Sequence, residues 1–73
     1  MSNITAVNTR NQFRGAIASI RRGDVMSEVE VETTAGIISA VVTSSSDDRL
    51  GLRVGDEALA LFKAADVLVA KLG

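Results

Sequence analysis

The stretch from Met26 to Thr33, MSEVEVET, alternates between two kinds of side chain. A period of two with β-branched residues is typical of a strand that buries one face. The two faces are Ser27, Val29, Val31 and Thr33 on one side and Glu28, Glu30 and Glu32 on the other. Carboxylates in a row can coordinate a hard cation, but calcium sites normally draw their ligands from a tight loop. We therefore interpret the glutamates as a solvated face, and the stretch commits the chain to a β-sheet.

Two more strands are expected beside this one. Residues 13–23, FRGAIASIRRG, carry Ile17 and Ile20 as apolar anchors. Residues 36–44, GIISAVVTS, form a continuous apolar run rich in Ile and Val, which predicts a deeply buried strand. The short TAG sequence between the second and third strands predicts a hairpin turn.

Residues 44–52, SSSDDRLGL, predict one or two helical turns. Ser45 or Ser46 is the expected N-cap, and Gly51 ends the segment. Two adjacent aspartates lie in the first turn, where negative charge is favourable.

The last segment, ALALFKAADVLVAKL, fits two structures. Its alanines and leucines favour a helix by propensity, whereas its pattern fits two short strands, residues 58–62 and 67–71, interrupted at KAAD. We favour strands, because the first three strands need partners to close a barrel. The whole pattern predicts an all-β fold in one domain over residues 1–73, a small five-stranded OB-like barrel with one short helix.

A chain of 73 residues that folds alone buries a smaller fraction of its unfolded surface than a larger domain does. The fraction is roughly 60–65% at this size, so an isolated core is marginal. The chain has no cysteine and no histidine, which removes disulfides and zinc sites as compensation. Oligomerisation is the compensation that stays available, and 47% hydrophobic residues is generous for so small a surface. We therefore expect a homo-oligomer.

The composition also excludes whole classes of function. Without histidine, a nucleophilic Ser or Thr lacks its usual base, so we do not expect an enzyme. A net charge of −1 with no basic block does not favour nucleic acid, and OB-fold nucleic-acid binders need aromatic platforms, whereas this chain has two Phe and no Tyr or Trp. No apolar run is long enough to span a membrane, and no signal peptide is evident. A cytoplasmic protein without a membrane partner is expected.

Four motifs occur in order along nearly the whole chain. They are RNQFRG from residue 10, SEVEVE from residue 27, LGLRVGDE from residue 50 and LFKAADVLVA from residue 61. Together they resemble the molbindins, the Mop-type molybdenum-pterin-binding proteins, which consist of a single oxyanion-binding TOBE/Mop domain. The resemblance implies a homohexamer, built as a trimer of dimers, that binds molybdate and tungstate between subunits. Its implied role is intracellular molybdenum storage or homeostasis, with no covalent cofactor and with molybdenum bound as an oxyanion rather than as a metal cation. The alternative is an OB-fold interaction module that partners a larger transport or regulatory protein.

The resemblance also assigns the residues of the anion site. One wall is Arg10 and Asn11 with Asn8 and Thr9 beside them, and the other wall, from another subunit, is Lys63 with Ala64. A tetrahedral dianion offers only acceptor oxygens, so its site needs converging donors such as arginine, lysine and backbone amides. Taken singly, Arg10 is better explained as a structural hydrogen bond or salt bridge across the subunit interface, and Lys63 as an exposed charge at a strand end; the family pattern as a whole favours anion binding.

The chain departs from the family pattern at both walls. Many members carry a serine at the position of Asn8, and a serine or threonine at Ala64 or Ala65. A second class of anion site in the family lies on a symmetry axis, and the resemblance places it in the loop formed by Gly23, Asp24, Val25, Met26 and Ser27. The sequence does not separate molybdate from tungstate, or storage from buffering or donation.

Overall fold

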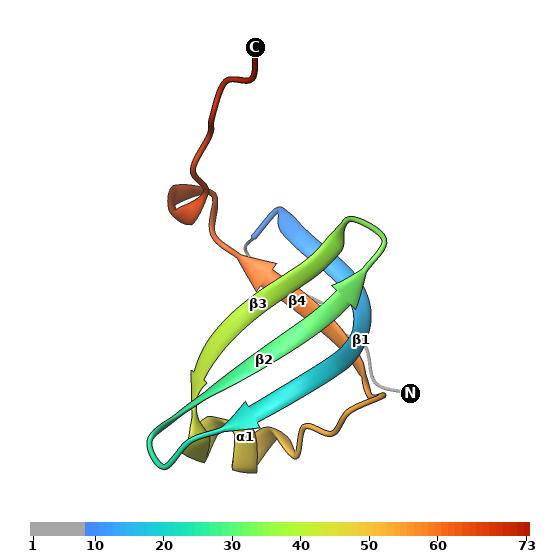
Figure 1. Cartoon of the computed structure of the whole chain (residues 1–73), viewed down its shortest axis with the longest axis vertical. Coiled ribbons are helices and arrows are strands. Elements are labelled where there is room, and N and C mark those ends of the chain that lie inside the picture. The colour runs from blue at the N-terminus through green and yellow to red at the C-terminus, as the bar shows by residue number, and fades with distance from the viewer. Residues whose placement is uncertain (1–8) are drawn as a thin grey trace.

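A computed structural model describes residues 9–73 of the chain. Its elements are the strands β1 (Asn11–Arg22), β2 (Met26–Thr33), β3 (Gly36–Thr43) and β4 (Glu57–Phe62), the helix α1 (Ser44–Leu50) and the 3-10 turn η1 (Ala64–Asp66). The strands form one antiparallel sheet in the order β3-β2-β1-β4. The sheet curls strongly, with α1 at one end and the C-terminal segment running away from the body (Figure 1). The mostly β architecture with one short helix agrees with the fold class predicted from the sequence.

The long strand β1 serves two neighbours. Its first half pairs with β4 and its second half pairs with β2, with an irregularity between Ile17 and Ser19. The extra residue in this bulge moves the inward face from odd to even positions, so both Ile17 and Ile20 reach the core. Gly15 pairs with both neighbours, and a Cβ there would collide with the backbone carbonyl of Glu32. A side chain at this position is therefore incompatible with the sheet as built.

The core follows the alternation predicted for β2. Ile17, Val29 and Val31 are buried, and the partly buried residues packed against them are Ile20, Val42, Leu52 and Ala58. Glu28 and Glu32 are exposed on the opposite face of β2. Glu30 on the same face is half-buried, and its carboxylate accepts a hydrogen bond from the Ser19 hydroxyl. The interpretation of the glutamates as a solvent-side row is confirmed.

The helix α1 begins earlier than predicted. Its N-cap is Thr43, whose hydroxyl oxygen accepts a hydrogen bond from the N–H of Ser46 at 3.1 Å. The expected caps Ser45 and Ser46 lie inside the helix, because β3 ends at Thr43 and the helix starts at the next residue without a connecting loop. The predicted end at Gly51 is confirmed, and this residue has the left-handed conformation, φ 63°, that a glycine adopts at low energetic cost.

The fifth strand expected over residues 67–71 does not form within this chain. The structure has four strands across residues 9–73, and the final stretch, residues 67–73, is neither strand nor helix. The interruption predicted at KAAD is present as η1. After η1 the chain leaves the sheet (Figure 1), so no strand of the same molecule lies beside it to complete hydrogen-bond pairing.

Candidate functional site

The two predicted walls of the anion site meet at one end of the sheet. Asn11 and Phe62 are the last paired residues of β1 and β4. Arg10 and Lys63 are therefore the first residues beyond this pair, at neighbouring strand ends of one chain, whereas the family resemblance implied that the Lys63 wall comes from another subunit. Ala64 follows Lys63 as the first residue of η1. Asn8, the remaining member of the predicted set, lies outside the described residues.

Thr9 links the two strands at this end. Its hydroxyl donates a hydrogen bond to the backbone carbonyl of Phe62 at 2.6 Å, and its hydroxyl oxygen faces the N–H of Asn11 at 3.4 Å. The Gln12 side-chain amide donates to the backbone carbonyl of Thr9 at 2.5 Å. The short turn that carries Arg10 is thus fastened on one side to β4 and on the other to β1. Sequence reasoning missed the roles of Gln12 and of the Phe62 carbonyl, and no motif signals either.

Two aromatic rings pack just below this end. Phe13 and Phe62 are half-buried and stack with ring centroids 5.8 Å apart and an interplanar angle of 22°. The stack joins β1 to β4 beneath the charged residues. It gives the end of the sheet a firm apolar base.

Arg10 and Lys63 are neighbouring cations without a carboxylate partner in the described part of the chain. Arg14 pairs with Glu57 at 2.6 Å, and Arg21 lies 3.7 Å from Glu28. Arg10 and Lys63 are exposed and make no ion pair with any residue in the range 9–73, as is also true of Arg49, Arg53 and Lys71. Arg10 and Lys63 are distinguished by the strand pairing, which places them next to each other. Two neighbouring cations that lack a counter-charge from this range raise the local positive potential, which is the condition that an anion needs.

The predicted second site lies at the opposite end of the sheet, in the loop between β1 and β2 (Figure 1). Ser27 and Ser44 are buried, and their hydroxyls share a hydrogen bond of 2.8 Å. The Ser44 hydroxyl also donates to the carbonyl of Gly23 at 2.6 Å, and its N–H donates to the carbonyl of Val25 at 2.7 Å. These bonds hold the loop against the start of α1. Asp24, Val25 and Met26 are exposed on it.

Carboxylates dominate the charge around this loop. The Arg22 guanidinium donates to Asp47 at 3.0 Å and to Asp48 at 2.8 Å. The pKa of Arg22 is raised above its ordinary value, chiefly because of the hydrogen bond to Asp48 and the attraction of that carboxylate. Asp47 is buried, and its Oδ1 has no hydrogen-bond partner among the described residues. The positive charge nearest the loop is therefore already neutralised within the chain, unlike that of Arg10 and Lys63.

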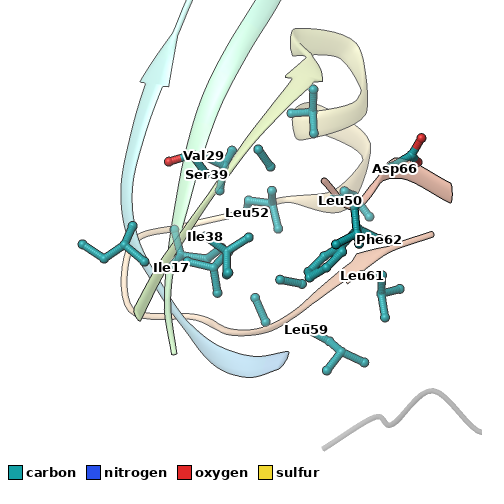
Figure 2. Close-up of a pocket in the computed structure, with 17 residues that line it drawn as sticks. Ile17, Val29, Ile38, Ser39, Leu50, Leu52, Leu59, Leu61, Phe62 and Asp66 are labelled. Carbon is teal, nitrogen blue, oxygen red and sulfur yellow. The ribbon is translucent and has the colours of Figure 1, made fainter. Parts of the chain in front are cut away.

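A hollow of about 660 Å³ separates the two edge strands. Figure 2 shows side chains from both edges along it, including Ile38 of β3 and Phe62 of β4. The lining is almost wholly apolar, and Asp66 of η1 lies at its rim. This hollow is the open side of the curled sheet, where a closed barrel has a further strand. The described part of the chain contains no helix long and apolar enough to cross a membrane.

The curled four-stranded sheet with one short helix is a small β domain, and the TOBE domain family matches residues 8–69. The chain belongs to this family, and its relatives are Mop-type molybdenum-pterin-binding proteins. A probable molybdenum-pterin-binding protein of Haemophilus influenzae is 36% identical over 64 residues, which cover 86% of this chain and 93% of the relative. The resemblance drawn from the four motifs is confirmed.

Solved structures agree with this assignment. MopII from Clostridium pasteurianum superimposes with a TM-score of 0.85 at 30% identity. The match covers 90% of this chain and 100% of the MopII chain. A molybdate-binding protein from Sporomusa ovata gives a TM-score of 0.86 at 28% identity, covering 92% and 100%. The chain is thus a member of a family whose named relatives are molybdate- and molybdenum-pterin-binding proteins.

Proposed function

We propose that the chain binds molybdate, and also tungstate, which is an oxyanion of nearly the same size, at the end of the sheet that carries Arg10 and Lys63. The observation that carries the proposal is the juxtaposition of these two cations without a carboxylate partner among the described residues. Binding is reversible capture in the cytoplasm for molybdenum storage or homeostasis. No bond of the anion is made or broken, and no covalent cofactor takes part.

The donors match a tetrahedral dianion. Arg10 supplies a planar fork of N–H groups, Lys63 a compact ammonium charge, and Asn11 a side-chain amide. Ala64 supplies only its backbone N–H, at the start of η1, where no side chain caps the turn. Asn8 completes the set that the family pattern implies. Sulfate is a dianion of the same shape, so selectivity against it comes from the size of the cavity.

One chain alone offers these donors from one side. Arg10 and Lys63 are exposed, and a dianion loses much hydration energy on binding, which only an enclosing set of charge-assisted hydrogen bonds offsets. We therefore propose that a second subunit covers the site. The assembly implied by the family resemblance, a homohexamer built as a trimer of dimers, provides such an interface.

The C-terminal segment supports an assembly of this kind. Leu68, Val69 and Leu72 are 96%, 92% and 91% exposed, although they are among the most hydrophobic residues of the chain. In an extended segment, Leu68, Ala70 and Leu72 share one face, with Lys71 on the other. We propose that this segment is the missing fifth strand, supplied to another copy at the open side of its sheet.

The loop that contains Gly23, Asp24, Val25, Met26 and Ser27 stays a proposal for the second anion site. Its own chain surrounds it with Asp24, Asp47 and Asp48, and pairs Arg22 with two of these carboxylates. An anion there requires cations from neighbouring subunits. Anion stoichiometry in Arg10→Ala is the test for this site, because anions that stay bound when the main site is disabled occupy a different site.

The main site is tested by charge removal. Arg10→Ala and Lys63→Ala should each weaken molybdate binding by roughly 2–5 kcal/mol, because each leaves the anion without one of its two cationic partners. Isothermal titration calorimetry measures the affinity. Arg53→Ala is the matched control, since Arg53 is an exposed arginine in the loop before β4, away from this end. Near wild-type affinity in both test variants would remove Arg10 and Lys63 from the site.

A second candidate function is an interaction module that partners a larger transport or regulatory protein. The exposed apolar C-terminal segment is the observation that favours it, because such a segment fits another protein as well as another copy. Native mass spectrometry with molybdate, and with sulfate as the control, separates the two functions. A hexamer that gains discrete molybdate masses favours storage, whereas a hexamer that gains none favours the interaction module.

A further inference from the structure

We propose that the Thr9 hydroxyl is a positioning group for the anion site and not one of its ligands. It ties the turn that carries Arg10 to the strand end that carries Lys63. This inference rests on the proposed function, because it concerns how the two cations are held for the same anion. It changes the role that the family pattern suggests for Thr9, which is a place among the anion's ligands.

The Thr9 hydroxyl has no free hydrogen to donate to an anion. A threonine hydroxyl has one hydrogen to donate. In this structure the hydroxyl donates to the Phe62 carbonyl at 2.6 Å, a short distance for such a bond. What the oxygen presents elsewhere is lone pairs, and molybdate, which has only acceptor oxygens, is repelled by them. Thr9 can donate to an anion only after its bond to Phe62 is broken.

The bond from Thr9 to the Phe62 carbonyl lies where the pairing of β1 with β4 ends. The ladder between β1 and β4 ends at the pair Asn11 and Phe62, and chain ends beyond a ladder tend to fray. The Thr9 bond adds a tie across the two strands at the point where the ladder stops. Gln12 anchors the same turn from β1, because its side-chain amide donates to the Thr9 carbonyl. Thr9, the residue that precedes Arg10, is therefore held to β4 by its hydroxyl and to β1 by its carbonyl.

The consequence for binding is preorganisation. Arg10 and Lys63 repel each other when no anion is present, and this repulsion favours separation of the strand ends that bear them. The Thr9–Phe62 bond opposes that separation at the adjacent residues. A site that is already assembled loses less conformational freedom when the anion arrives, and so binds it more tightly.

Thr9→Val tests the inference, because valine keeps the branched shape and loses the hydroxyl. We expect molybdate affinity to fall roughly five- to tenfold, the effect of one lost hydrogen bond. In the anion-free protein, we also expect faster hydrogen exchange at the amide of Phe62, on the strand end that the bond ties. The amide of Asn11 does not serve as the readout, because it faces the Thr9 hydroxyl oxygen and loses that acceptor directly. Thr9→Ser, which restores the hydroxyl, should return both values to within about twofold of wild type. Thr34→Val, at an exposed threonine of the β2–β3 turn, is the control for the substitution itself.

Each outcome has one meaning. A loss of affinity together with faster exchange, both restored by Thr9→Ser, supports the positioning role. A loss of affinity with unchanged exchange in the anion-free protein would identify Thr9 as a direct ligand and overturn the inference. Unchanged affinity in Thr9→Val would overturn it as well. If the wild-type protein itself takes up no molybdate in the calorimeter, the proposed function fails first, and that result is distinct from the other three.

Discussion

The two ends of the curled sheet differ in whether their charged and polar side chains have partners within the chain. At the α1 end, the polar groups find partners within the chain: Ser27 with Ser44, Ser44 with the Gly23 carbonyl, and Arg22 with two aspartates. At the other end, the chain leaves Arg10 and Lys63 without acidic partners in the described range. Beyond them it leaves three large apolar side chains of the C-terminal segment almost fully exposed.

The difference shows which part of the molecule is complete alone. At the α1 end, hydrogen bonds within the chain fix the loop and the helix start in one arrangement, although Asp47 Oδ1 has no partner among the described residues and Val25 and Leu50 are exposed. The open end presents charge without counter-charge and apolar surface without cover, two features that are unfavourable for an isolated small domain. We infer that the open end is built to meet an anion and another copy of the chain.

The largest effect should come from the C-terminal segment. Leu68→Asp combined with Leu72→Asp should convert the assembly into monomers, because each leucine contributes roughly 1.5–3 kcal/mol when it is buried at an interface. Size-exclusion chromatography with light scattering measures the mass. Lys71→Glu, which adds negative charge on the other face of the same segment, should keep the assembly. An unchanged mass in the double leucine variant would show that the segment takes no part in association.

A smaller effect is expected at Gly15, where β1 pairs with both β2 and β4. Gly15→Ala places a Cβ against the carbonyl of Glu32 and should push β1 away from β2. The loss of stability should be up to about 3 kcal/mol, as for other overpacked positions. Chemical denaturation measures it, with the exposed Ala16→Ser on the same strand as the control. A Gly15→Ala variant as stable as wild type would mean that the strand pair tolerates displacement here.

The smallest effect concerns the closed end. Ser44→Ala removes the hydroxyl that bonds both Ser27 and the Gly23 carbonyl, and should lower stability by about 1–2 kcal/mol. Molybdate binding at the far end should keep its affinity. Ser45→Ala, at an exposed position of the same helix, should change stability by less than about 0.5 kcal/mol. Equal stability of the two serine variants would contradict the assignment of Ser44 as a partner that fixes the loop.

Much of the sheet could be predicted from local pattern. The alternation from Met26 to Thr33 indicated which face of β2 is buried, and Gly51 marked the end of α1, because both signals depend only on neighbouring residues. The N-cap was placed too late, since nothing local shows that β3 runs directly into α1. The strand expected over residues 67–71 has the right composition, but a strand forms only beside a partner, and this chain offers none along its course.

The anion site was predicted from family resemblance, and physical pattern alone would not have found it. Arg10 and Lys63 are 53 positions apart in the sequence, and only the pairing of Asn11 with Phe62 brings them together. The bond from Thr9 to the Phe62 carbonyl is invisible in the sequence for a further reason. Every residue except proline has the same backbone acceptor, so residue types carry no information about which carbonyl is chosen.

Lys63 and Leu68 are separated by little more than the three-residue turn η1. In the proposed assembly, one short stretch of chain therefore holds the anion on one side and a neighbouring subunit on the other. Whatever binds only the assembled form stabilises it by mass action. Molybdate should then tighten the oligomer, and dilution of the protein should release molybdate. A store built in this way empties as the concentration of the protein falls.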